Sequence, residues 1–320
     1  MGNEAMNKRI LLLTDGKAGH ENQSRAFARA LGRDFDLVKV AFRGKAAKTL
    51  SYIADIAGIG CLGLVDGLDG FANGKMPNGS GCSAVIGTGS GTFYAAKTLA
   101  RRLGAKCGVV LYPRGYRVSG FDCVLAPSFD RPKPAANVIE IPANLVANDS
   151  AFYESGVAAF RERHSGPTDN LVGVIVGGPN KCSTLDAEWM KARLDEIFAE
   201  NAGAQLCVTT SRRTPPDVET VVDSYPWAYK LVYSRDHFNP IPAFVSLAKR
   251  LYVTAESTGM LSEACTFGTA EVVALDNLKP GPHKFRRFVE DLRAAGYVDG
   301  ARKIDLSAQF AAAKKLLLEP

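Results

Sequence analysis

Residues 255 to 259, Ala-Glu-Ser-Thr-Gly, have the small and hydroxyl side chains that let backbone N–H groups approach an anion closely. They join an apolar segment, Leu251 to Thr254, to a predicted helix from Ser257 to Phe267, whose N-terminus attracts negative charge. Glu263 lies about one and a half turns into this helix, where a carboxylate can bond ribose hydroxyls. An ordinary strand–helix–strand unit with a small-residue turn is the alternative. The nucleotide diphosphate interpretation selects Ser257, Thr258, Gly259, Met260 and Glu263.

Two other segments suited to binding anions follow predicted strands in the same half of the chain. Residues 177 to 181, Gly-Gly-Pro-Asn-Lys, follow a strand, and residues 210 to 213, Thr-Ser-Arg-Arg, follow the next one. Backbone amides in tight turns hold phosphate oxygens, and guanidinium groups bind planar oxyanions at two points. A plain turn and a surface charge pair are the alternatives. The candidate ligand-binding residues here are Gly177, Gly178, Asn180, Lys181, Ser211, Arg212 and Arg213.

A polar loop, Thr14 to Gln23, follows the first predicted strand. It places Asp15, Lys17 and His20 at the carboxyl end of a strand, where α/β proteins bind ligands. The loop is neither a Walker loop nor a GxGxxG fingerprint. We predict that Asp15 or His20 acts as a general base. In the alternative, Asp15 is a turn residue and His20 lies beside a helix cap.

The composition is that of an ordinary globular protein, with 46% hydrophobic and 22% charged residues. The net charge of +6 comes from scattered residues, which permits anionic small-molecule substrates or weak attraction to an anionic membrane surface. It argues against nucleic acid as a partner, because that requires a basic stripe with interleaved aromatic residues. The seven cysteines form no Cys-x-x-Cys pair and the four histidines lack metal-ligand spacing. We therefore expect a cytoplasmic protein with reduced thiols and with no metal or cofactor; peripheral membrane contact stays open.

Short apolar runs alternate with helical patterns, which predicts parallel sheets buried on both faces. Strands are expected at 9–14, 35–42, 84–87, 108–112, 123–126, 138–141, 171–176, 205–209, 230–232, 251–254 and 271–275. Helices are expected at 22–31, 91–103, 185–199, 240–248, 257–267, 284–295 and 306–318.

The predicted fold class is α/β, with two Rossmann-like doubly wound domains and a cleft between them. We expect an N-terminal Rossmann-like domain at residues 8–165, a C-terminal one at residues 170–300, and at residues 301–320 a helix that packs back on the body. The apolar, glycine-rich segment Ser51 to Gly81 is predicted as a buried helix pair followed by a loop. Its alternative is an apolar surface that touches lipid or a lipid-linked substrate.

Taken together, these residues resemble the elongated-mitochondria family, which comprises plant mitochondrial fission factors and bacterial relatives, and this chain is closest to the bacterial type. The segments that carry the resemblance are TDGKAGHENQ at 14–23, IVGGPNK at 175–181, VTTSRRTP at 208–215, NPIPAF at 239–244, VTAESTGMLSEACTFG at 253–268 and KFRRF at 284–288. The resemblance implies a GT-B glycosyltransferase-like architecture, with residues 8–165 as the acceptor-side domain and residues 170–300 as the nucleotide-sugar domain. It also implies that Glu263 binds the ribose, that Ser257 to Met260 meet the diphosphate, and that the loop at 15–20 supplies the base.

Three functions follow from this interpretation. The first is a metal-independent glycosyltransferase of the GT-B kind, with a nucleotide diphosphate sugar in the interdomain cleft and an acceptor that is left open, including a lipid-linked one. The second is a nucleotide-sugar epimerase or hydrolase. The third is a non-catalytic recruiting protein with a protein partner, as the plant relatives imply, because fold does not fix function.

Overall fold

The computed structural model describes residues 8–71 and 73–319. The chain divides into two compact units: unit 1 extends to Ala147 and resumes at Leu306, and unit 2 is Asn148–Asp305. The sequence suggested a boundary near residues 165–170. Helix α4 (Ser150–Arg163), for which the sequence predicted no element, nevertheless belongs to unit 2. It packs there because the Phe160 ring meets the Phe244 ring edge-on at 5.8 Å.

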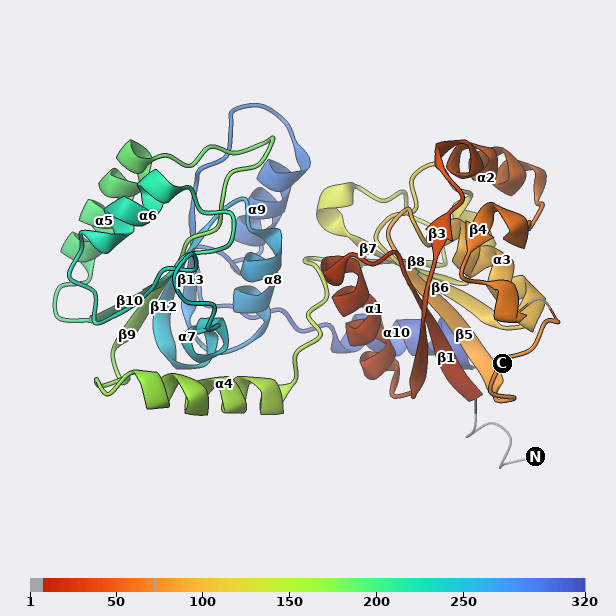
Figure 1. Ribbon diagram of the computed structural model, residues 1–320, viewed down its shortest axis with the longest axis horizontal. Helices are drawn as coiled ribbons and strands as arrows, with labels where there is room; N and C mark the ends of the chain where they lie inside the picture. Colours follow the sequence, from red (N-terminus) through yellow and green to blue (C-terminus); the bar gives the residue numbers. More distant parts are fainter. Residues whose placement is uncertain (1–7, 72, 320) are drawn as a thin grey trace. The chain divides into compact units, whose positions relative to one another are not determined.

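Unit 1 is built on a six-stranded sheet in which every pair is parallel (Figure 1). Its order is β2 (Phe35–Lys39), β1 (Lys8–Thr14), β5 (Gly81–Thr88), β6 (Lys106–Val110), β7 (Cys123–Pro127), β8 (Val138–Ile141). Helices α1 (Ala18–Leu31), α3 (Phe93–Leu103) and α10 (Ser307–Leu318) cover it. Leu11 and Leu13 pack in the core with Phe93, whereas Ile10 and Leu12 pack on the other face with Leu317. The continuous apolar run of β1 reflects this double burial.

Unit 2 has a five-stranded parallel sheet. Its order is β11 (Tyr229–Leu231), β10 (Gln205–Thr209), β9 (Leu171–Ile175), β12 (Ala248–Thr254), β13 (Glu271–Leu275). The helices of this unit are α4, α5 (Ala187–Glu200), α6 (Pro216–Asp223), α7 (Ile241–Leu247), α8 (Thr258–Thr266) and α9 (Lys284–Ala294). The predicted α/β class with two doubly wound sheets is confirmed.

The prediction for Ser51 to Gly81 is wrong. Instead of a buried helix pair, this region has one half-exposed helix, α2 (Lys45–Ala57), followed by turns at Leu62–Leu64 and Asp69–Phe71. The short strands β3 (Ala41–Phe42) and β4 (Val65–Asp66) pair beside it, so the strand predicted at 35–42 is also divided. Apolar content alone suggested burial, but the residues of α2 that are buried include Ser51 and Asp55.

Candidate functional site

In each sheet the order of the strands reverses between two neighbours. In unit 1 the reversal lies between β1 and β5, and in unit 2 it lies between β9 and β12. The connections leave such neighbours toward opposite faces, and the carboxyl ends of the strands there are where open α/β sheets bind ligands. The loop after β1 and the turns after β9 and β12 lie at these reversal points, and these segments contain most of the residues selected from the sequence.

Glu256 is the centre of the polar cluster in unit 2, and the sequence analysis did not select it. Its side chain is buried, and Oε1 accepts hydrogen bonds from the Gly178 amide at 2.8 Å and the Ser257 hydroxyl at 2.9 Å. The Thr254 hydroxyl also contacts Oε1, and Asn277 donates to Oε2 at 2.8 Å. A buried carboxylate with four protein donors fixes the turns after β9 and β12 to each other.

Gly177 and Gly178 are glycines because other parts of the protein fill the space beside them. A Cβ atom on Gly177 would lie 1.9 Å from Glu256 Oε1, and one on Gly178 would lie 2.2 Å from the Arg213 carbonyl oxygen. The Gly177 amide donates to the Thr254 hydroxyl at 2.9 Å. These two glycines therefore allow the three turns to pack tightly around the end of β9.

The turn after β10 is joined to the same cluster. The Thr214 hydroxyl donates to the Gly177 carbonyl at 2.6 Å and accepts from the Ser211 amide at 2.8 Å. The Arg213 guanidinium donates to the Gly178 carbonyl at 3.1 Å. Arg212 is exposed, and within residues 8–71 and 73–319 no side chain or backbone group pairs with its guanidinium. Arg213 thus closes the cluster, and Arg212 faces solvent.

Asn180 and Lys181 shape and flank the turn after β9. Asn180 Oδ1 accepts from the Cys182 amide at 2.7 Å, which makes Asn180 a turn-forming residue. Lys181 is exposed, and its ammonium group has no partner among the residues that the structure describes. Its carbonyl accepts from Lys279 at 3.3 Å, so a second lysine lies beside this turn.

The N-terminus of α8 follows Glu256. The Thr258 amide donates to the Glu256 carbonyl at 3.1 Å and the Leu261 amide to the Ser257 carbonyl at 2.9 Å. The amides of Gly259 and Met260 have no acceptor within the described part of the chain. A Cβ atom on Gly259 would meet nothing within 4 Å. The first turn of α8 therefore presents two open N–H groups next to the end of the strand.

Glu263 lies farther along α8 and contacts residues at the start of unit 2. Its Oε1 accepts from the Tyr153 hydroxyl at 2.9 Å and from the Asn148 amide group at 3.1 Å. No donor to Oε2 is present in the described residues. Burial raises the pKa of Glu263 above its ordinary value, and the bonds from Tyr153 and Asn148 offset only part of this rise.

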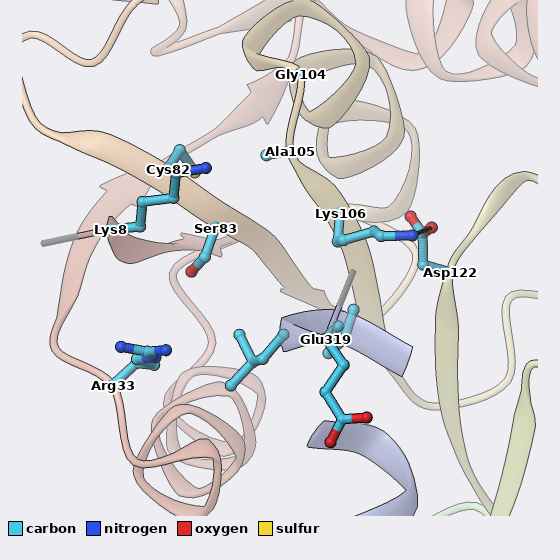
Figure 2. A pocket seen from close by; sticks show the side chains of 11 residues that line it. Lys8, Arg33, Cys82, Ser83, Gly104, Ala105, Lys106, Asp122 and Glu319 are labelled. Atoms are coloured by element: carbon cyan, nitrogen blue, oxygen red, sulfur yellow. Dashed lines mark hydrogen bonds and ion pairs between the residues drawn. The ribbon is translucent and has the colours of Figure 1, made fainter. Parts of the chain in front are cut away.

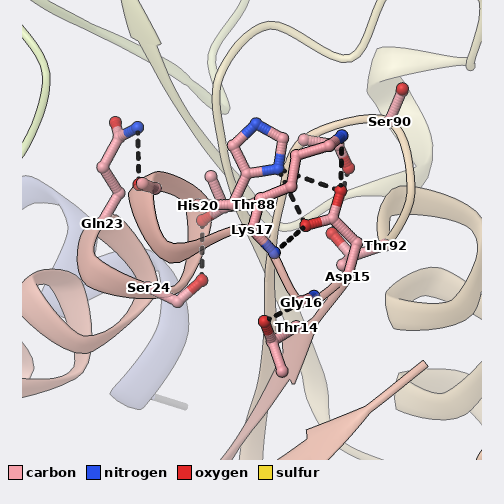
Figure 3. Close-up of polar contacts among 12 residues, drawn as sticks. Thr14, Asp15, Gly16, Lys17, His20, Gln23, Ser24, Thr88, Ser90 and Thr92 are labelled. Atoms are coloured by element: carbon pink, nitrogen blue, oxygen red, sulfur yellow. Dashed lines mark hydrogen bonds and ion pairs between the residues drawn. The ribbon is translucent and has the colours of Figure 1, made fainter. Parts of the chain in front are cut away.

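In unit 1, Asp15 holds His20 and Lys17 (Figure 3). His20 Nδ1 lies 3.1 Å from both carboxylate oxygens of Asp15, and Lys17 Nζ lies 3.0 Å from Oδ2. Because an ionised carboxylate only accepts hydrogen bonds, Nδ1 carries the proton in this contact. In the neutral imidazole, Nε2 is then the nitrogen with the free lone pair. The His20 side chain is 23% exposed, against 10% for that of Asp15.

The pKa of Asp15 is lowered by its neighbours. Burial on its own raises the pKa of this carboxyl group, but the hydrogen bond from Lys17 and the proximity of His20 outweigh burial. The aspartate is therefore ionised over the whole neutral range and orients the imidazole.

A glycine loop after β5, absent from the sequence-based selection, packs against this pair. A Cβ atom on Gly89 would lie 2.4 Å from His20 Cε1, and one on Gly91 would lie 2.8 Å from Asp15 Cβ. Gly89 also has a φ of 81°, in the region that favours glycine. The pattern Gly-Thr-Gly-Ser-Gly-Thr at 87–92, directly after a buried strand, is the signal that identifies this loop.

A pocket of about 480 Å³ opens at the opposite edge of the unit 1 sheet (Figure 2). Lys8 and Lys106 line it at the amino ends of β1 and β6, together with Arg33 and Cys82. It contains none of the residues selected from the sequence. Because α/β sheets bind ligands at the carboxyl edge, we assign no site to this pocket.

Two solved structures share the architecture of the chain. One is MurG of Acinetobacter baumannii, with 14% identity and a TM-score of 0.51 over 98% of this chain and 92% of that one. The other is a Listeria monocytogenes protein assigned as a UDP-N-acetylglucosamine 2-epimerase, with 12% identity and a TM-score of 0.52 over 97% and 88%. These matches establish a GT-B type of fold.

Two curated proteins are similar in sequence. An uncharacterized protein of Rickettsia prowazekii is 27% identical over 135 residues, which are 40% of this chain and 38% of that protein. The mitochondrial fission protein ELM1 of Arabidopsis thaliana is 25% identical over 244 residues, 67% of this chain and 56% of that protein. The matched regions thus span less than two thirds of either relative. The model of the family described as mitochondrial fission ELM1 matches residues 18–315, nearly the whole chain, and the chain therefore belongs to that family.

Proposed function

We propose that the protein binds a nucleoside diphosphate sugar through unit 2 and transfers the sugar to an acceptor hydroxyl, with His20 of unit 1 as the general base. The observation that carries this proposal is the position of both residue sets at the strand-order reversals of their sheets. A solved protein of the same fold supports it, since the Listeria monocytogenes protein is assigned as a UDP-N-acetylglucosamine 2-epimerase, an enzyme named for a nucleoside diphosphate sugar.

The diphosphate binds at the N-terminus of α8. The open amides of Gly259 and Met260 donate to its oxygens, and the positive end of the helix dipole adds attraction. Arg212 and Lys181, exposed at the neighbouring strand ends, neutralise the charge that develops on the leaving diphosphate. These cations take the role that a divalent metal plays in other transferases, so the proposed reaction is metal-independent.

The ribose binds at Glu263. One carboxylate oxygen is held by Tyr153 and Asn148, which fixes the orientation of the other oxygen, Oε2, toward an incoming hydroxyl. A ribose hydroxyl that donates to Oε2 forms a charge-assisted hydrogen bond, stronger than one between neutral groups.

In the transfer step the acceptor oxygen forms a bond to the anomeric carbon of the sugar, and the bond from that carbon to the diphosphate oxygen breaks. The acceptor proton passes to His20 Nε2, and the nucleoside diphosphate leaves with the bonding electron pair. Asp15 holds the imidazole and stabilises the imidazolium that forms. Replacing His20 by Asn should lower turnover by about 10²–10⁴-fold while leaving nucleotide affinity unchanged.

A thermal-shift screen tests the donor site. The wild-type protein is screened against UDP, GDP, ADP, CDP and dTDP, with and without a divalent metal; a ligand at about 100 times its Kd adds ≈ 2.7 kcal/mol. Glu263→Gln should abolish the shift. Glu290→Gln, a change at an exposed position of α9, should leave it intact.

The pH dependence of nucleotide affinity shows whether the Glu263 carboxylate contacts the nucleotide. Because the pKa of Glu263 is raised, nucleotide affinity should fall on acidification at a pH above the ordinary glutamate range. The Glu263→Gln variant should show no such fall. No shift with any nucleotide, from folded wild-type protein, would overturn the proposal in favour of a recruiting protein. Consumption of the donor without an acceptor would instead identify an epimerase or hydrolase.

A further inference from the structure

Helix α2 carries an exposed apolar stripe. Four of the six large hydrophobic side chains that are exposed in the described part of the chain lie within residues 50–59. Their exposed fractions are 51% for Leu50, 61% for Ile53, 69% for Ile56 and 59% for Ile59. Scattered exposed aliphatic residues are normal on a soluble protein, but a cluster such as this, with three residues on α2 and Ile59 just after its end, marks an interaction surface.

Helix α2 buries its more polar face and exposes its apolar face, the reverse of an ordinary surface helix. Its buried residues are Ala47, Ser51 and Asp55, which lie four apart and therefore on one face. Ile53 and Ile56 lie on the opposite face, in solvent. A surface helix of a globular protein usually points its apolar stripe inward. Burial of its own apolar surface therefore does not explain how α2 is oriented.

Buried polar contacts hold α2 in this orientation. Asp55 Oδ1 lies 2.6 Å from Lys97 Nζ, and Oδ2 accepts from the Arg117 amide at 2.7 Å. The Ser51 hydroxyl is 2.8 Å from that of Tyr116. Rotating α2 to bury its isoleucines would leave Lys97 as a buried charge without its carboxylate, which is strongly unfavourable. The outward stripe is therefore a fixed part of the structure.

The charges around the stripe are basic. Residues 43–60 contain Arg43, Lys45 and Lys48 and a single carboxylate, Asp55, which is buried; Arg43 is paired with the exposed Asp66 of β4 at 2.6 Å. At the C-terminal end of α2, Arg101 donates to the Gly58 carbonyl at 3.1 Å. Lys45, at the opposite end, is exposed. Cations thus lie at both ends of an aliphatic ridge.

We propose that α2 docks the protein on an anionic lipid surface, lying in the plane of the interface with Leu50, Ile53, Ile56 and Ile59 inserted among the acyl chains. An interfacial helix of this kind combines buried aliphatic area with basic residues that pair with anionic headgroups. No helix in residues 8–71 and 73–319 has the length and apolar composition needed to cross a bilayer. The proposed association is peripheral because α2 lies in the plane of the interface, and it does not rest on the proposed sugar transfer.

A lipid surface fits this ridge better than a protein partner does. The four exposed side chains are all aliphatic, whereas protein interfaces are enriched in Tyr, Trp, Phe and Met. A convex helix needs a matching groove on a protein partner, but it inserts directly into the headgroup region of a bilayer. The cations at both ends complement anionic headgroups.

Vesicle flotation with the full chain tests the proposal. Phosphatidylcholine vesicles are compared with vesicles of equimolar phosphatidylcholine and phosphatidylglycerol. The protein should float with the anionic vesicles, and the double variant Ile53→Ser, Ile56→Ser should lose at least about tenfold in its partition coefficient. Lys45→Ser should lose about fivefold. Leu37→Ser, which removes an exposed leucine from β2, should partition like the wild type.

The midpoint of thermal unfolding shows whether each variant is folded; since both isoleucines are exposed, it should not change. Absence of wild-type binding to anionic vesicles would overturn the proposal, and so would a folded double variant that binds as tightly as the wild type. A dimer in sedimentation that the double variant abolishes, without vesicle binding, would assign the ridge to a second copy of the chain.

Discussion

Asp15 and Glu256 are carboxylates in comparable places, each within two residues of the end of a strand at a strand-order reversal. Their surroundings differ. Asp15 contacts Lys17, whose side chain is 67% exposed, and the partly exposed imidazole of His20. Glu256 is 2% exposed and is surrounded by donors from Gly178, Thr254, Ser257 and Asn277.

The comparison shows that the same position in the topology serves two purposes. In unit 1 the carboxylate orients a side chain whose Nε2 remains available for proton transfer. In unit 2 the carboxylate holds turns together. Among the described residues, the Gly259 and Met260 amides of α8 and Glu263 Oε2 have no protein partner. A charged residue at a strand-order reversal is thus a candidate for catalysis or binding only when its hydrogen-bond partners leave an accessible donor or acceptor atom.

The largest expected effect comes from removing Glu256. Glu256→Ala leaves four buried or partly buried donors unpaired, so the free energy of unfolding of unit 2 should fall by about 3–5 kcal/mol. Urea unfolding followed by tryptophan fluorescence measures this unit selectively, because the two tryptophans of the chain, Trp189 and Trp227, both lie in unit 2. A loss below about 1 kcal/mol would show that Glu256 is not structural and would break the comparison.

A pair of glycine variants gives an effect of intermediate size. Gly177→Ala places a methyl group 1.9 Å from Glu256 Oε1, so unit 2 should lose about 2–3 kcal/mol. Gly259→Ala has open space around the new methyl group and should be neutral or stabilising by up to about 1 kcal/mol. The same fluorescence assay measures both. Equal destabilisation by the two variants would show that Gly177 is not packed tightly against Glu256.

The smallest expected effect is at Asp15. Because its pKa is lowered in the folded state, its contribution to stability is present above the unfolded pKa of about 4 and is lost as the pH falls through the folded value. The difference between wild type and Asp15→Asn should therefore be constant near neutral pH and vanish in acid. It should stay below about 1 kcal/mol, since Lys17 is largely exposed. Hydrogen exchange of the β1 amides measures it, and a difference that grows in acid would contradict the assignment.

The two parallel sheets could be predicted because most of their strands are short apolar runs that are buried on both faces. Helix α4 was missed because only Tyr153 and Phe160 of its fourteen residues are buried, which leaves no clear apolar period. The proposed base loop was found because its polar residues are consecutive in the sequence.

Glu256 could not be recognised as structural from the sequence. A charged residue between Ala255 and Ser257 gives no sign of burial, and its partners lie up to 78 residues away. The exposure of α2 was hidden for the same reason, since it depends on the contact between Asp55 and Lys97, 42 residues apart. Burial and exposure that depend on polar contacts between distant residues cannot be predicted from the sequence and are seen only in the structure.

The C-terminal helix α10 belongs to unit 1, and this affects the order in which the core of unit 1 is completed during synthesis. Figure 1 shows the blue helix α10 beside the red α1, although they come from opposite ends of the sequence. Ala313 and Leu317 of α10 complete the core on the face of the sheet that includes Ile10 and Leu12. Because α10 follows unit 2 in the chain, this apolar face is completed only after unit 2 has been made, and the part of it that α10 covers stays exposed until then.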